Sequence, residues 1–311
     1  TLIADEREKI QSDEIFDRIR SELTSFVAIE PLEPSESMNG ILRFYQKEGL
    51  GWLSFLERFG LGGCLADDMG LGKTVQVLAH LEKRRYFDNE KKKSEKQFGT
   101  SLVVAPRSLI FNWIKEAQKF TPLLKVLDFS GDTRTAENVD FSEYDLVLVT
   151  YGTLRRDITR LREFVFDYVI LDEAQVIKNA KTITAKSACL LHSKNRLALS
   201  GTPVENHLGD LWSIFEFLNP GILGCSAAFS KVQKMVSSVN DNNCDLLRTM
   251  LKPFILRRTK SQVASDLPER TEEIVLCEME PAQKKIYDEL KKYYQANLIK
   301  KVEIQGLNKS K

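Results

Sequence analysis

The order of apolar and polar residues predicts a sheet of buried strands between helices over residues 60–218. Short runs rich in β-branched residues are apolar throughout, as buried parallel strands are, and longer stretches with helical spacing alternate with them. This alternation is typical of βαβ units in an α/β domain. We predict strands at residues 63–66, 101–105, 125–129, 145–150, 168–171 and 196–199.

The pattern changes at both ends of this region. Four apolar residues near the N-terminus recur at helical spacing and predict an amphipathic helix that ends at the prolines of residues 31–34: Phe16, Ile19, Leu23 and Phe26. Residues 34–39 are predicted to be a linker, and the charged segment 88–97, which lacks an apolar period, a mobile surface loop. Beyond residue 219 the pattern is helical but less regular, with turns near Gly221, Gly224 and residues 240–243.

Composition narrows the class of protein. A chain of 311 residues with 42% hydrophobic content can bury one large domain and a smaller attachment. Its longest apolar runs are far shorter than the ~20 residues of a membrane span, so we expect a soluble protein without membrane contact. The five cysteines form no C-x-x-C pair and there are three histidines, which argues against a zinc site and favours reduced thiols in a cytosolic protein. The chain starts at Thr1 with no signal-peptide pattern, and we expect it to be a piece of a longer protein.

The net charge of +1 hides opposite charges at the two ends. Residues 1–37 contain four basic and ten acidic residues, whereas residues 281–311 contain eight lysines and three acidic residues. A basic tail can contact phosphate backbones. A solvated lysine face is the more common meaning of such a run, so the tail does not decide the function.

A phosphate-binding loop is predicted between strand 63–66 and the amphipathic helix that follows. Its residues are Asp67, Asp68, Met69, Gly70, Leu71, Gly72, Lys73 and Thr74. Glycines let backbone N–H groups close around phosphates at a helix N-terminus, Lys73 would neutralise the β/γ oxygens, and the Thr74 hydroxyl can ligate Mg²⁺. Asp67 stands where the strict pattern G-x-x-x-x-G-K-T has its first glycine, and a chance Gly-Lys-Thr is the alternative interpretation.

A pair of acidic residues supplies the complementary half of a phosphoryl-transfer site. Asp172 and Glu173 follow the apolar strand 168–171, about 100 residues after the loop. Asp172 would hold Mg²⁺, and Glu173 would orient or deprotonate the attacking water. As an isolated match, two carboxylates at a strand end would be a solvated loop, but their order after a phosphate loop favours catalysis.

A third segment, Ser200-Gly201-Thr202-Pro203, follows strand 196–199, and by itself it is a turn. Taken together, the segments resemble the Swi/Snf family of helicase-like DNA translocases over roughly residues 38–295. The stretches that carry the resemblance are Leu42 to Gly49, Leu65 to Thr74, Val103 to Pro106, Asp172 to Gln175 with Ile177-Lys178-Asn179, Ser200 to Pro203 with Glu205-Asn206, and Phe254 to Lys260 with Asp266-Leu267-Pro268.

The resemblance implies a RecA-like α/β P-loop lobe with a mostly parallel sheet flanked by helices, and roles for further residues. In the family a glutamine upstream of the loop recognises adenine, a place that Gln46 holds here, with Arg43 nearby. Asp67 in the first loop position is usual for the family, and Gln175 would belong to the nucleotide site. Segments lining the nucleic-acid groove, or linking it to ATP, correspond to Pro106, Arg107, Tyr151, Gly152, Ser200, Gly201 and Thr202. For Asn112 and Trp113, a role in helix initiation or in the core is at least as well supported as a role in the nucleic-acid groove.

The resemblance also implies domain boundaries and partners. Residues 1–37 would be an acidic leader helix and linker, 38–220 the ATP-binding lobe, 221–277 a helical extension and exit segment, and 278–311 the start of a second lobe. ATP, Mg²⁺, double-stranded DNA and the second RecA-like lobe are the implied ligands and partners. The location would be the cytoplasm and nucleoid for a bacterial member, and the nucleus for a eukaryotic one.

Two other functions stay open at this point. An RNA helicase lobe would have similar phosphate chemistry, although the loop sequence and Ile177-Lys178-Asn179 disfavour it. A regulatory nucleotide-binding or protein-interaction module without turnover is disfavoured by the presence of Glu173. Stimulation of ATP hydrolysis by duplex DNA would distinguish a DNA translocase from both of these alternatives.

Overall fold

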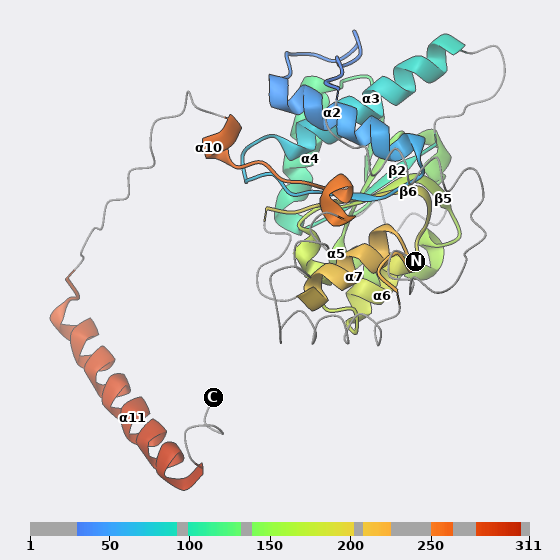
Figure 1. Cartoon of the computed structure of the whole chain (residues 1–311). Coiled ribbons are helices and arrows are strands. Elements are labelled where there is room, and N and C mark those ends of the chain that lie inside the picture. Colours follow the sequence, from blue (N-terminus) through green and yellow to red (C-terminus); the bar gives the residue numbers. More distant parts are fainter. Residues whose placement is uncertain are drawn as a thin grey trace. The chain divides into compact units, whose positions relative to one another are not determined.

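The computed structural model describes residues 30–91, 99–131, 139–201, 208–224, 250–263 and 278–305 (Figure 1). The predicted leader helix, most of the charged segment 88–97, the turn cluster at 240–243 and Thr202 lie outside the described residues. The chain divides into two compact units, residues 1–265 and 266–311.

The first unit is built on a seven-stranded sheet in the order β3-β4-β2-β5-β6-β1-β7, and each neighbouring pair is parallel. This confirms the predicted α/β fold with a parallel sheet. The strands are β1 (Gly63–Leu65), β2 (Ser101–Ala105), β3 (Val126–Asp128), β4 (Leu146–Thr150), β5 (Val165–Leu171), β6 (His192–Leu199) and β7 (Ile255–Leu256). The first six match the predicted runs. Strand β5 begins three residues earlier than predicted because Asp167 interrupts its apolar run, and β6 begins four residues earlier because its first four residues are polar.

Helices cover both faces of the sheet (Figure 1). One face carries α2 (Phe44–Arg58), α3 (Lys73–Lys91) and α4 (Arg107–Phe120), and the other carries α5 (Tyr151–Leu161), α6 (Ile183–Cys189) and α7 (Leu208–Leu218). Alternate strand residues enter two separate cores, as the period of two requires: Val103 packs in the core with Trp113, and Val104 in the core with Leu154. Helix α3 continues to Lys91, so residues 88–91 are helical and the predicted loop cannot begin at 88.

Strand β7 is a feature that the hydrophobic pattern did not predict. It belongs to a segment predicted as a helical extension, which also contains η4 (Lys252–Phe254) and α10 (Lys260–Val263). The register pairs Cys64 with Ile255 and Leu65 with Leu256, and the Trp52 indole N–H donates to the Pro253 carbonyl at 2.8 Å. Residues 250–263 therefore belong to the same unit as the phosphate loop.

Two short 3₁₀ turns complete the described part of the first unit, η2 (Phe141–Glu143) and η3 (Ala174–Ile177). The described part of the second unit contains a single helix, α11 (Pro281–Gln305), whose described side chains are almost all exposed. Within the described ranges, no helix has both the length and the apolar character needed to cross a membrane.

Candidate nucleotide-binding site

The predicted phosphate loop lies between the end of β1 and the start of α3, where the fold would place a phosphate group. Gly70 and Gly72 have φ angles of 89° and 74°, in the left-handed region that favours glycine. At Gly72 a Cβ atom would also lie only 2.7 Å from the Gln46 side-chain nitrogen. The loop conformation therefore requires glycine at both positions.

The side chains of Lys73 and Gln46 each donate a hydrogen bond to a backbone carbonyl of the loop. The Lys73 ammonium donates to the Asp67 carbonyl at 2.7 Å, so its charge lies over the loop. The Gln46 amide and the Tyr45 hydroxyl each donate to the Leu71 carbonyl at 3.2 Å, which places the N-terminus of α2 against the loop. Gln46 also accepts a hydrogen bond from the Arg43 backbone N–H at 2.9 Å.

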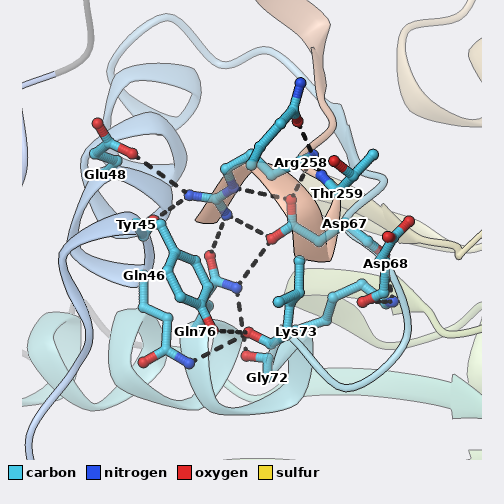
Figure 2. A network of polar contacts seen from close by, with 12 residues as sticks. Tyr45, Gln46, Glu48, Asp67, Asp68, Gly72, Lys73, Gln76, Arg258 and Thr259 are labelled. Atoms are coloured by element: carbon cyan, nitrogen blue, oxygen red, sulfur yellow. Dashed lines mark hydrogen bonds and ion pairs between the residues drawn. The ribbon is translucent and has the colours of Figure 1, made fainter. Parts of the chain in front are cut away.

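The carboxylate of Asp67 is buried in the middle of a polar network (Figure 2). One of its oxygens accepts from the backbone N–H and the Nε of Arg258, at 3.1 and 2.9 Å. The other accepts from Arg258 Nη2 at 2.5 Å and from Gln76 Nε2 at 3.2 Å. Both oxygens are thus occupied by protein donors, so we assign Asp67 to the support of the loop.

Arg258 extends this network to helix α2. Its guanidinium donates to the Tyr45 carbonyl and to the Gln76 amide oxygen, and lies 3.9 Å from Glu48 (Figure 2). Gln76 reaches this position because residue 49 is glycine: a Cβ there would lie 1.9 Å from the Gln76 oxygen. Sequence reasoning missed Arg258 and Gln76. The available signal was Asp67, which replaces the first glycine of the strict loop pattern, because a buried aspartate requires a cation as its partner.

The acidic pair lies where β5 ends. The Asp172 carboxylate accepts from the Trp113 indole N–H at 2.8 Å and from the Glu173 backbone N–H at 2.9 Å. Burial raises the pKa of Asp172 above its usual value, while the Trp113 hydrogen bond and the nearby Lys73 charge act to lower it. Because β1, β6 and β5 run parallel, the loop that follows β1 and this carboxylate at the end of β5 lie at the same edge of the sheet.

Glu173 has an unusual backbone conformation. Its φ of 51° and ψ of 55° are left-handed, which no other non-glycine residue in the described ranges adopts. Its carboxylate accepts from the Gln175 amide at 2.6 Å, and the Gln175 oxygen accepts from the Ser200 hydroxyl at 3.1 Å. The structure thus joins the end of β5 to the end of β6 through three of the predicted site residues.

Comparison with known proteins decides the family. A family model described as the SNF2-related domain matches residues 45–311. The chain belongs to this family. YwqA of Bacillus subtilis, a provisionally named ATP-dependent helicase/translocase, is 40% identical over 286 residues, which are 88% of this chain and 30% of that protein. The TATA-binding protein-associated factor MOT1 of Saccharomyces cerevisiae is 33% identical over 291 residues, covering 88% of this chain and 16% of MOT1.

A solved SNF2 structure is similar as well. The SWI2/SNF2 ATPase core of Sulfolobus solfataricus in complex with double-stranded DNA is 38% identical, with a TM-score of 0.69, covering 90% of this chain and 57% of that one. The chain thus spans less than a third of these two curated relatives and somewhat over half of the solved core.

Other predicted site residues of this SNF2 chain lie around the loop and the strand ends. Tyr151 is buried and its hydroxyl donates to the Asp172 carbonyl at 2.8 Å. Arg43, Met69 and Arg107 are exposed. The structure describes Thr74, Pro106, Gly152 and Gly201 as partly exposed, whereas Thr202 lies outside the described residues.

Trp113 is a functional candidate that the sequence alone left undecided. It is fully buried, which agrees with the predicted core role. Its indole N–H also donates to the Asp172 carboxylate and so fixes that side chain. Its neighbour Asn112 is exposed and donates to Glu116 at 2.9 Å. The direction of an indole N–H depends on tertiary packing, so no sequence signal could have assigned this role.

The residues fit a nucleotide with a magnesium ion. The left-handed glycines and Lys73 make a phosphate cradle, and a Cβ on Gly72 would collide with the Gln46 amide that contacts it. No cluster of three metal-ligating His, Cys, Asp or Glu side chains occurs among the described residues. A single carboxylate and a hydroxyl suit Mg²⁺, which usually takes one or two carboxylates together with substrate phosphates and water.

Proposed function

We propose that this chain is the first ATP-binding lobe of a DNA-stimulated ATPase that moves along double-stranded DNA, and that hydrolysis requires a second lobe. Membership of the SNF2 family supports the use of ATP. The observation that carries the proposal is the position of Lys73, Asp172 and Glu173 after β1 and β5, two parallel strands on either side of β6, because these are the groups that phosphoryl transfer requires.

Each of these residues has a distinct role in the proposal. Lys73 binds the β/γ-phosphates, Thr74 and Asp172 hold Mg²⁺, and Glu173 orients the attacking water. Gln46, with Arg43 nearby, binds the adenine, and Gly70 to Gly72 supply backbone N–H groups to the phosphates. Bound Mg²⁺ would neutralise charge that develops on the phosphate oxygens.

The link to DNA runs through the ends of β2, β4 and β6. Pro106 and Arg107, Tyr151 and Gly152, and the segment 200–202 follow these strands, and we assign them to the nucleic-acid groove or its coupling to ATP. Two hydrogen bonds support such coupling, since Tyr151 contacts Asp172 and Ser200 contacts Gln175. The solved relative from Sulfolobus holds double-stranded DNA, which favours duplex DNA as the partner.

The proposal assigns part of the catalytic site to a second lobe. In this proposal residues 38–220 form the ATP-binding lobe together with β7 from the exit segment 221–277, and residues 278–311 begin the second lobe. An arginine that a facing lobe contributes is worth about 10³ to 10⁵ in rate. The chain alone should therefore hydrolyse ATP slowly and respond little to DNA.

The test compares this chain with a protein extended through the following lobe. The ATP turnover rate is measured for both at low salt, with no nucleic acid, with duplex DNA and with duplex RNA. We expect duplex DNA to stimulate ATP turnover strongly in the extended protein but not in this chain. Lys73→Ala in the extended protein should abolish that stimulation. Equal rates and equal responses for the two proteins would contradict the split site, and preferential stimulation by RNA would favour an RNA helicase lobe.

A further inference from the structure

The chain segment that follows β7 runs beside the phosphate loop. Strand β7 pairs in parallel with β1, so residues after Leu256 travel in the same direction as residues after Leu65. The pairing continues past both strands: Ala66 N–H donates to the Leu256 carbonyl at 2.7 Å, and Asp68 N–H donates to the Arg258 carbonyl at 3.0 Å. Residues 257–260 are therefore held along one side of the loop.

Lys260 ends this run at the outer turn of the loop. Its backbone N–H donates to the Asp68 carboxylate at 3.0 Å, which anchors the residue. Its side chain extends over Gly70: a Cβ built on Gly70 would lie 3.5 Å from the Lys260 ammonium nitrogen and 3.6 Å from the carbon next to it. The charged end of an exposed lysine thus lies on the side of Gly70 toward which a Cβ would project.

Three cations surround the loop, but they differ in their partners. Arg258 is neutralised by Asp67, and the Lys73 ammonium donates to the loop carbonyl of Asp67. In the ranges that the structure describes, no acidic side chain forms an ion pair with the Lys260 ammonium. A phosphate group held by the loop amides would lie within the ~8 Å over which charges act at physiological salt.

We propose that Lys260 is a second phosphate-binding lysine of the nucleotide site, acting beside Lys73 and supplied by the segment that leaves the sheet. This inference rests on the proposed binding of ATP and adds a residue to it. The contact is between the ammonium and the phosphate chain of the nucleotide. Its contribution should therefore grow with the number of phosphates and be small for a nucleoside monophosphate.

The experiment measures the dissociation constants of AMP, ADP and ATP by calorimetry, with Mg²⁺, for the wild-type chain and for Lys260→Ala. A charge-assisted contact at a partly solvated site predicts a loss of about 5- to 10-fold for ATP. The loss should be smaller for ADP and under about 2-fold for AMP, because charge attraction scales with the ligand's charge. Lys260→Arg should stay within about 2-fold of the wild type, since it keeps the charge.

Lys252→Ala is the matched control, because Lys252 is an exposed lysine in the same segment and its removal changes the net charge equally. It should leave all three constants unchanged. Unchanged ATP affinity in Lys260→Ala, or equal losses for AMP and ATP, would overturn the inference while leaving the proposed function intact. Failure of the wild type to bind ATP, or undiminished binding by Lys73→Ala, would overturn the proposed function together with it.

Discussion

Arg258 donates its backbone N–H and two side-chain N–H groups to the carboxylate of Asp67, which lies 191 positions earlier in the chain. Both residues are buried, Asp67 completely. Removing one member of such a pair leaves the other as an uncompensated charge in the interior. The loop that we assign to phosphate binding is thus supported by a residue from the far side of the sequence.

Asp67→Asn should lower the free energy of unfolding by about 3 kcal/mol or more, because the buried Arg258 loses its counter-charge while the shape of residue 67 is kept. Urea unfolding at neutral pH measures the loss. Glu33→Gln is the control, because it removes the Glu33–Lys47 pair, in which the glutamate is largely exposed, and should cost less than about 1 kcal/mol. Similar losses in the two variants would contradict a structural role for the Asp67 pair.

Trp113→Phe should weaken the response to Mg²⁺. The substitution keeps most of the buried aromatic surface and removes the N–H that fixes Asp172. Loss of such a supporting hydrogen bond to a metal ligand typically costs about 10- to 100-fold in metal affinity. We expect the Mg²⁺ concentration for half-maximal ATPase activity of the extended protein to rise by about 10-fold or more.

Trp52→Phe is the matched control for Trp113. Trp52 is also buried in the core, and its N–H donates to the Pro253 carbonyl, away from the acidic pair. Both variants should lose stability, but Trp52→Phe should not change the Mg²⁺ requirement. A rise in that requirement in both would attribute the effect to loosened packing.

Glu173→Gln should preserve binding of ATP with Mg²⁺ and remove most hydrolysis in the extended protein. The amide keeps the size of the side chain but cannot accept a proton or orient water as a carboxylate does. Calorimetry measures binding, and the release of phosphate measures turnover. Turnover within a few-fold of the wild type would place catalysis at another residue.

His80 should make stability depend on pH. Burial, followed by the charges of Arg84 and Lys83, lowers the pKa of His80 to about 3, so the imidazole is neutral although Glu57 lies 3.4 Å away. In the unfolded chain the histidine takes up a proton near pH 6.5. Below that pH the unfolded state binds a proton that the folded state does not, so the free energy of unfolding should fall by about 1 kcal/mol per pH unit between 6.5 and 3.

Urea unfolding at pH 7.5, 6.5, 5.5 and 4.5 tests this dependence. His80→Gln should have a shallower slope below pH 6.5 than the wild type, whereas His192→Gln, at an exposed position, should keep the wild-type slope. A wild-type slope in His80→Gln would assign the pH dependence to the carboxylates instead.

The local hydrophobic pattern was sufficient to predict the sheet, but it could not predict contacts between segments that are distant in the sequence. The apolar runs ending at Ala105, Thr150 and Leu171 predicted strands because burial on both faces shows in the sequence itself. Strand β7 has two residues, too few to make a pattern, and its place depends on pairing with β1 across the whole lobe. The roles of Asp67 and Arg258 likewise follow from packing that brings them together.

The left-handed backbone of Glu173 has a consequence for engineering the chain. A non-glycine residue in this conformation costs on the order of 1 kcal/mol or more, so glycine or asparagine would suit the turn better than glutamate. A search for thermostable variants that scores melting temperature alone would be drawn to replace this residue. Such a screen would select against the carboxylate on which we expect turnover to depend, so stability and activity have to be measured side by side at this position.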